Sequence, residues 1–223
     1  NTALSIVDCV TSLGACNVPV DEWKLDIVAS GSQKGYMIPP GLSFIAMSQK
    51  AWEAAEKSNL PKFYLNLKSY KKSLLSNSNP YTPAVNLVFA LDESLKMMRE
   101  EGLENIFLRH EKHKLAMSSA AKALNLKLFA DEKYLSPSIT AIETGEIDAE
   151  EFRKTIKNKF DILLAGGQDH LKGKIFRVGH LGYVNDRDII TVISAISNTL
   201  LDLGKINAQQ AGEALVIASK YLE

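Results

Sequence analysis

The feature that most constrains the fold is a change in hydrophobic periodicity near residue 84. Before it, three short apolar runs rich in β-forming residues each end in turn residues, at 3–7, 25–29 and 42–47. Apolar runs without clean alternation are typical of strands in a sheet that is covered on both faces. After residue 84, apolar residues recur every three or four positions, which predicts helices. The chain is therefore expected to be an α/β protein.

The same periodicity predicts the remaining elements and a division into two parts. Gly102 interrupts a long helical pattern, so we expect one helix before it and a second helix that continues through Leu124. Further helices are predicted at 48–57, 69–75, 148–159, 186–203 and 208–221, and further strands at 126–130, 139–143, 162–165 and 174–178. We expect residues 1–100 to form a sheet-based domain with the start of the interdomain helix, and residues 101–223 to form a smaller α+β domain.

Composition excludes several classes of partner. The chain has 223 residues, and its 26 Lys and Arg balance 26 Asp and Glu, so its formal net charge of zero offers no basic surface for a nucleic acid or an anionic membrane. No apolar run reaches the roughly 18 residues that a membrane span needs. The two cysteines, Cys9 and Cys16, cannot supply four thiolates, so no metal centre is predicted, and a reducing cytoplasm fits best. Because the chain starts with Asn1 and almost at once enters a strand-like run, we expect it to be the C-terminal portion of a longer polypeptide.

Two charged residues follow predicted strands. Asp8 comes directly after the first apolar run, and Lys34 lies four residues beyond Ser30 at the end of the second. In open α/β sheets, ligand-binding groups gather at the carboxyl ends of the strands, so the two side chains are expected to share one sheet edge. From position alone, an ion pair or two unrelated surface charges is the commoner use of such residues.

The sequence around these positions resembles that of the class V aminotransferases, which are pyridoxal-phosphate enzymes of fold type I. The similar segments are DCVTSLG at 8–14, SGSQKG at 30–35, PPGL at 39–42, NPYTP at 79–83, LDESL at 91–95, GLEN at 102–105 and FRVGHLG at 176–182. The resemblance covers essentially the whole chain and is strongest to serine–pyruvate and alanine–glyoxylate aminotransferases. It implies part of the large, mostly parallel sheet domain of that fold, plus its small C-terminal α+β domain.

The resemblance implies roles for residues near the first two strands. Lys34 matches the lysine that holds pyridoxal 5'-phosphate covalently, and its freed amine would then act as general acid and base. Asp8 matches the acid that pairs with the pyridine nitrogen, where a carboxylate keeps the ring protonated as an electron sink. Gln33 matches a contact to the cofactor phosphate.

It also implies residues that bind substrate and a partner's cofactor. Arg177 matches the residue that binds the substrate α-carboxylate, because a planar guanidinium can donate two parallel hydrogen bonds. Thr82 matches a phosphate contact made to the neighbouring subunit, so a homodimer with shared active sites is implied. Relatives often carry a tyrosine three residues before this threonine, whereas this chain has Asn79 there and Tyr81 adjacent, so the phosphate ligand is left open among these side chains.

The implied reaction is transfer of an amino group from alanine or serine to glyoxylate or pyruvate. Within the same fold, a cysteine desulfurase is disfavoured because Gln33 precedes Lys34 and no cysteine follows Cys16, and a phosphoserine aminotransferase fits the PPGL segment less well. A hydrogenase subunit is a further alternative, but two neighbouring cysteines cannot hold a nickel–iron or iron–sulfur centre in the familiar way. A non-catalytic fragment remains the rival from another class, and the 223-residue chain alone is expected to be inactive or nearly so.

The four histidines are expected to have no metal-binding role. His110 and His113 lie three residues apart on a predicted helix with no cysteine or carboxylate completing a metal pattern, so they are predicted to be surface or interface residues. His170 and His180 are predicted to occupy solvated loops.

Overall fold

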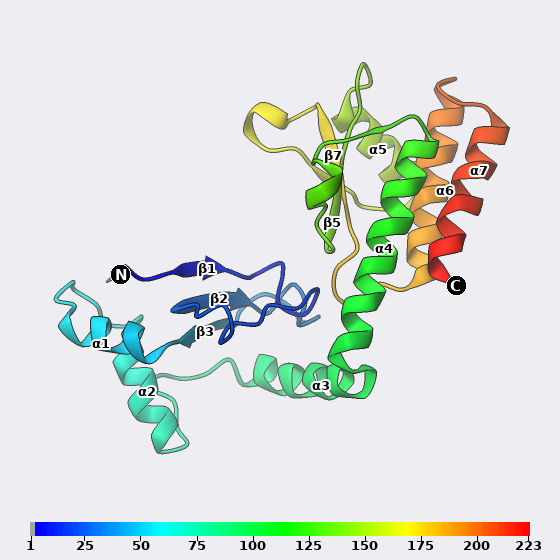
Figure 1. The fold of residues 1–223 in the computed structure, drawn as a ribbon. Helices are drawn as coiled ribbons and strands as arrows, with labels where there is room; N and C mark the ends of the chain where they lie inside the picture. Colours follow the sequence, from blue (N-terminus) through cyan, green and yellow to red (C-terminus); the bar gives the residue numbers. More distant parts are fainter. Residues whose placement is uncertain (1–2) are drawn as a thin grey trace. The chain divides into compact units, whose positions relative to one another are not determined.

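The computed structural model describes residues 3–223, which divide into two compact units (Figure 1). Unit 1 contains the chain up to Leu13 and Val18–Glu100, and unit 2 contains Gly14–Asn17 and Glu101–Glu223. Within residues 3–223, no helix combines the length and the apolar character needed to cross a membrane. Each unit carries its own sheet, so each is described by itself.

Unit 1 is built on a three-stranded sheet of order β1-β2-β3. Its elements are β1 (Ile6–Asp8), β2 (Ile27–Gly31), β3 (Ser43–Met47), α1 (Gln49–Lys57), α2 (Leu67–Leu75) and α3 (Val85–Glu101). β1 and β2 are parallel, whereas β3 runs antiparallel to β2. A parallel pair needs a long crossover, which residues 9–26 supply, while the shorter 32–42 loop can only return the chain antiparallel.

Residues 3–223 do not cover the outer strands of this sheet on both faces, whereas the sequence led us to expect a sheet covered in this way. Val28 in the central strand is 3% exposed, but Ile6 in β1 is 70% exposed and Ile45 in β3 is 49% exposed. An apolar sequence indicates that a strand is favoured to be buried. It does not show that the element covering the strand lies among residues 3–223. The three predicted strands themselves are confirmed, each within a few residues of its expected bounds.

Unit 2 packs a four-stranded antiparallel sheet of order β4-β5-β7-β6 against helices. Its elements are α4 (Leu103–Ala123), β4 (Lys127–Leu128), a 3₁₀ turn (Glu132–Tyr134), β5 (Ile139–Glu143), α5 (Ala149–Phe160), β6 (Ala165–Gly166), a second 3₁₀ turn (Asp169–Leu171), β7 (Ile175–Gly179), α6 (Asp186–Asp202) and α7 (Ala208–Leu222). Helices α4, α6 and α7 lie side by side (Figure 1). Fully buried alanines on two of them, Ala116, Ala120, Ala214 and Ala218, let α4 and α7 approach closely.

Capping residues explain where several helices begin. Ser48 accepts a hydrogen bond from the backbone N–H of Ala51 at the start of α1, and Asn185 and Asn207 form complete capping boxes at α6 and α7. Gly102, with φ of 84°, separates α3 from α4, because this backbone conformation is strained for residues with a Cβ. The predicted helix boundaries are confirmed to within two residues. The strand predicted at 162–165 is displaced, since only Ala165 of that range lies in β6.

A buried carboxylate joins the three strands of unit 1 at the edge opposite to the one that carries Asp8. Asp26 accepts hydrogen bonds from the backbone N–H of Ser5 at 3.0 Å, from Ser48 Oγ at 2.9 Å and from Lys50 Nζ at 3.0 Å. These contacts, the Ser5 backbone bond foremost, lower the pKa of Asp26 from 3.8 to about 2. The ionised carboxylate therefore stabilises the folded sheet.

We expect Asp26→Asn to lower the stability of unit 1 at pH 7. Because folding lowers the pKa of Asp26, its contribution is fully present above pH 3.8 and is lost as the pH falls through about 2. The stability deficit of the variant should therefore shrink over this interval. Both tryptophans, Trp23 and Trp52, belong to unit 1, so urea unfolding followed by tryptophan fluorescence reports on it directly. Asp21→Asn, a change at an exposed turn, is the matched control; an equal deficit in the control, or one that does not change with pH, would contradict this role.

Candidate functional site

Asp8 and Lys34 lie beyond the carboxyl ends of two adjacent parallel strands. Asp8 ends β1 and stands opposite Ala29 of β2, and the backbone N–H of Cys9 continues the pairing by donating to Ala29 O at 2.8 Å. Lys34 follows three residues after Gly31, the last residue of β2. Both side chains are exposed. The parallel pairing thus brings the two segments to the same edge of the sheet, where ligands bind in open α/β folds.

The loop that presents Lys34 is closed by a buried serine. Ser32 Oγ donates to Pro39 O at 2.8 Å and accepts from Leu42 N at 3.2 Å, while the Ser32 backbone N–H donates to Leu42 O at 3.1 Å. Within this loop, Lys34 O accepts from Met37 N at 2.9 Å, which forms a tight turn. Main-chain bonds therefore fix the Lys34 backbone and leave its side chain directed to solvent.

The two charged side chains have no charged partners in the part of the chain that the structure describes. Asp8 Oδ1 accepts from the Val10 backbone N–H at 2.9 Å, which orients the carboxylate, and neither Asp8 nor Lys34 forms an ion pair with a described residue. An unpaired amine and an unpaired carboxylate at one sheet edge suit a group that offers an aldehyde carbon and a protonated ring nitrogen. The Lys34 amine and the Asp8 carboxylate at this edge therefore fit pyridoxal phosphate.

Three further candidates also belong to unit 1 and are exposed: Gln33, Asn79 and Thr82. Gln33 folds back over Gly31, where a Cβ would lie 2.9 Å from Gln33 Oε1, so a larger residue at this position would displace the Gln33 side chain. Tyr81, between Asn79 and Thr82, donates its hydroxyl to Phe63 O at 3.1 Å. The Tyr81 hydroxyl is thus engaged within the chain, whereas Asn79 and Thr82 are exposed.

Arg177 belongs to unit 2, on strand β7. It pairs with Ala141 of β5 on one side and Ala165 of β6 on the other, so its backbone is held in the interior of the sheet. Its side chain is half-buried, and its Nε–H donates to Gly166 O at 2.9 Å. This partner could not be predicted from the sequence, because any residue can supply a backbone carbonyl.

The family model described as aminotransferase class-V matches residues 1–175 of the chain. The chain belongs to the class V aminotransferases. This family implies pyridoxal phosphate as the cofactor and the α/β fold of the fold type I enzymes. Among residues 3–223 of this class V chain, no group of three or more His, Cys, Asp or Glu side chains could hold a metal ion.

Relatives of this class V aminotransferase carry different names. The chain is 55% identical to the soluble hydrogenase small subunit of Synechococcus sp. over 99% of its length and 57% of that relative. It is 36% identical to the serine–glyoxylate aminotransferase of Methylorubrum extorquens, covering 99% of the chain and 56% of the relative. The crystal structure of ureidoglycine–glyoxylate aminotransferase from Bacillus subtilis matches with a TM-score of 0.90 and 32% identity, over 98% of this chain and 58% of the other. The chain thus spans little more than half the length of these relatives.

Three histidines of the class V chain are buried, which corrects the sequence-based expectation of surface and loop positions. His110, His113 and His180 are each 0% exposed, whereas His170 is exposed as expected. Burial lowers the pKa of all three, and that of His180 to about 4. Their burial depends on the packing of α4 against the segment after β7, which the helical pattern of α4 alone does not show.

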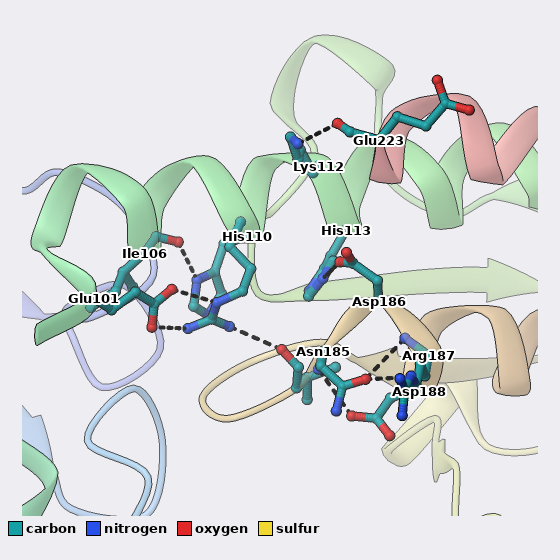
Figure 2. A network of polar contacts seen from close by, with 12 residues as sticks. Glu101, Ile106, His110, Lys112, His113, Asn185, Asp186, Arg187, Asp188 and Glu223 are labelled. Atoms are coloured by element: carbon teal, nitrogen blue, oxygen red, sulfur yellow. Dashed lines mark hydrogen bonds and ion pairs between the residues drawn. The ribbon is translucent and has the colours of Figure 1, made fainter. Parts of the chain in front are cut away.

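Figure 2 shows the polar network that joins α4 to that segment of the class V chain. His110 Nδ1 lies 2.7 Å from Ile106 O, so this nitrogen carries the proton, and His110 Nε2 accepts from the Gly182 backbone N–H at 3.3 Å. Arg109 donates to the carbonyl oxygens of Gly182 and Val184 at 2.9 and 3.0 Å. Its guanidinium also pairs with both carboxylate oxygens of Glu101. The loop after β7 is therefore held to α4 through backbone atoms of Gly182 and Val184.

Proposed function

We propose that the full polypeptide containing this chain is a pyridoxal-phosphate-dependent aminotransferase that moves an amino group from alanine or serine to glyoxylate or pyruvate. The proposal rests on Asp8 and Lys34, which lie at one edge of the unit 1 sheet in a class V chain. Neither side chain forms an ion pair with a described residue. Two relatives with different amino donors in their names, serine and ureidoglycine, share glyoxylate as the acceptor, which supports a small oxo-acid substrate here.

Lys34 and Asp8 would carry the chemistry. Lys34 Nζ would anchor the cofactor. Once freed by the incoming amino acid, the amine would move the proton from the substrate α-carbon to the cofactor C4′ carbon, and in the second half-reaction it would move a proton in the opposite direction, onto the α-carbon of the amino acid formed from the oxo acid. Asp8 holds a proton at the pyridine nitrogen, and the bond from Val10 keeps its carboxylate oriented for this role. Pyridoxal phosphate, when bound, supplies the electron sink for the α-carbon.

Other residues would bind substrate and the cofactor phosphate. Arg177 would bind the α-carboxylate of the amino acid, as the resemblance to the class V aminotransferases implies. Gln33 contacts the phosphate of its own subunit, and Thr82 and Asn79 contact the phosphate of the neighbouring subunit, so the active form is a homodimer. In this proposal, residues 1–100 belong to the large cofactor-binding domain and residues 101–223 form the small domain, and the enzyme works in the cytoplasm.

The proposal is tested with the full polypeptide and added pyridoxal phosphate. We expect cofactor-dependent formation of glycine from glyoxylate with alanine or serine as donor, and slower reaction with donors that have long side chains. Amino acid alone should convert the bound cofactor to its amino form, which absorbance spectra follow. Failure of every small donor and acceptor pair to exchange amino groups, in protein that binds the cofactor, would contradict the proposed reaction.

A further inference from the structure

The contact between Arg177 and Gly166 determines which side of the guanidinium is available. Arg177 Nε is engaged with Gly166 O, and its two terminal nitrogens have no hydrogen-bond partner among residues 3–223. A guanidinium can bind a carboxylate through its two terminal nitrogens, or through Nε and one of them. With Nε occupied, the first mode remains, so the position of Gly166 O fixes the plane in which Arg177 meets a carboxylate.

Gly166 belongs to an edge strand that has little support of its own. Strand β6 contains only Ala165 and Gly166 and pairs on one side, with β7. A two-residue edge strand is held by too few backbone bonds to keep a fixed position alone. Beyond β6, the Gly167 backbone N–H donates to Ile175 O at 3.1 Å, and side chains from another element add to this support.

Arg153 on α5 makes this contribution. Its Nε–H donates to Leu164 O at 2.8 Å, and its NH1 group donates to both carboxylate oxygens of Glu150 at 2.9 and 2.8 Å. The same ion pair lies against the backbone of Gly166, where an added Cβ would collide with the Arg153 guanidinium and the Glu150 carboxylate. The pair thus contacts the chain on both sides of Ala165, at Leu164 just before β6 and at Gly166 within it.

Helix α5 gives this contact a rigid base. Asp148 caps the helix by accepting from the backbone N–H groups of Glu150 and Glu151, and Phe152 and Ile156 fix the helix in the core with exposures of 2% and 0%. Arg153 therefore projects from a helix whose position is set by packing, and its own side chain is oriented by Glu150 one turn earlier.

We propose that Arg153 is a positioning residue for Arg177: together with Glu150 it holds β6 in place, so that Gly166 O orients the Arg177 guanidinium for end-on binding of the substrate carboxylate. The inference rests on the proposed function, since it assigns Arg177 to the substrate. It adds a residue more than twenty positions away in the sequence that never touches the substrate.

The test compares Arg153→Lys with the unchanged enzyme, using the full polypeptide with cofactor. Lysine keeps the charge but cannot bind Leu164 O and Glu150 in the same forked geometry. We expect the KM for alanine to rise about tenfold while kcat changes by less than about threefold, because the defect lies in carboxylate binding. In ¹⁵N-arginine NMR spectra of the cofactor-free protein, the Arg177 Nε–H should exchange faster with solvent.

Arg109→Lys is the matched control. Like Arg153, Arg109 pairs with a glutamate and donates to backbone carbonyl oxygens. None of the residues that Arg109 contacts bonds to Arg177. It should lower thermal stability without changing either the KM for alanine or the Arg177 Nε–H exchange rate. Equal changes in the two variants would overturn the inference, because they would indicate general loosening of unit 2.

Arg177→Lys separates failure of this inference from failure of the proposed function. If Arg177→Lys raises the KM for alanine while Arg153→Lys leaves both KM and the exchange rate unchanged, the positioning role is overturned and the function stands. If Arg177→Lys leaves the KM unchanged, the assignment of Arg177 to the substrate fails. In that case the solvent exchange rate of the Arg177 Nε–H alone tests whether Arg153 positions Arg177. Faster exchange in Arg153→Lys would support this positioning role, and an unchanged rate would overturn it.

Discussion

Lys34→Ala is expected to abolish both covalent cofactor attachment and amino transfer, with kcat reduced by roughly 10⁴-fold or more, because the anchor and the acid–base group are the same amine. The structure indicates that this change leaves the fold intact. The turn at Lys34 is closed by the Met37 backbone N–H, which donates to Lys34 O, and by hydrogen bonds of the Ser32 hydroxyl and backbone. The exposed Lys34 amine forms no ion pair with another described residue. Alanine at this position thus removes chemistry without removing a structural contact.

The measurement is borohydride reduction of the full polypeptide with bound cofactor, followed by peptide mapping. In the unchanged protein the reduced cofactor should be found on Lys34, and in Lys34→Ala on no lysine. Lys57→Ala, which changes an exposed lysine at the end of α1, is the matched control and should retain both attachment and activity. Cofactor that remains reducibly bound in Lys34→Ala would exclude Lys34 as the anchor.

Local sequence signals were sufficient to predict most elements. The spacing of apolar residues along a helix and the break at Gly102 are local features, so they can be interpreted without knowing the rest of the fold. The shared edge of Asp8 and Lys34 was also predictable, because β1 and β2 are joined by a crossover long enough for parallel pairing.

Features that depend on contacts between distant segments were not predictable in this way. His110 is buried because its Nε2 meets the backbone of Gly182, 72 residues later, and the helical pattern around it does not distinguish this from a surface position. The partner of Arg177 is a carbonyl oxygen, which any residue could supply, so only the pairing of β6 with β7 identifies Gly166. The exposure of Ile6 likewise depends on which elements cover β1. The apolar sequence of β1 does not identify those elements.

Asp8→Asn is expected to lower kcat by roughly 10²–10³-fold while leaving cofactor attachment at Lys34 intact. Asparagine has the shape of aspartate, and its Oδ1 can still accept from the Val10 backbone N–H, so the change removes the negative charge and keeps the local turn. A neutral amide does not stabilise a proton on the ring nitrogen, and the driving force for removing the α-proton falls with it. The rate of the half-reaction with alanine, followed by absorbance, measures this effect, and Asp21→Asn in the β1–β2 connection should leave it unchanged. If Asp8→Asn carried out the half-reaction with alanine at the rate of the unchanged protein, the Asp8 carboxylate would have no role at the cofactor ring.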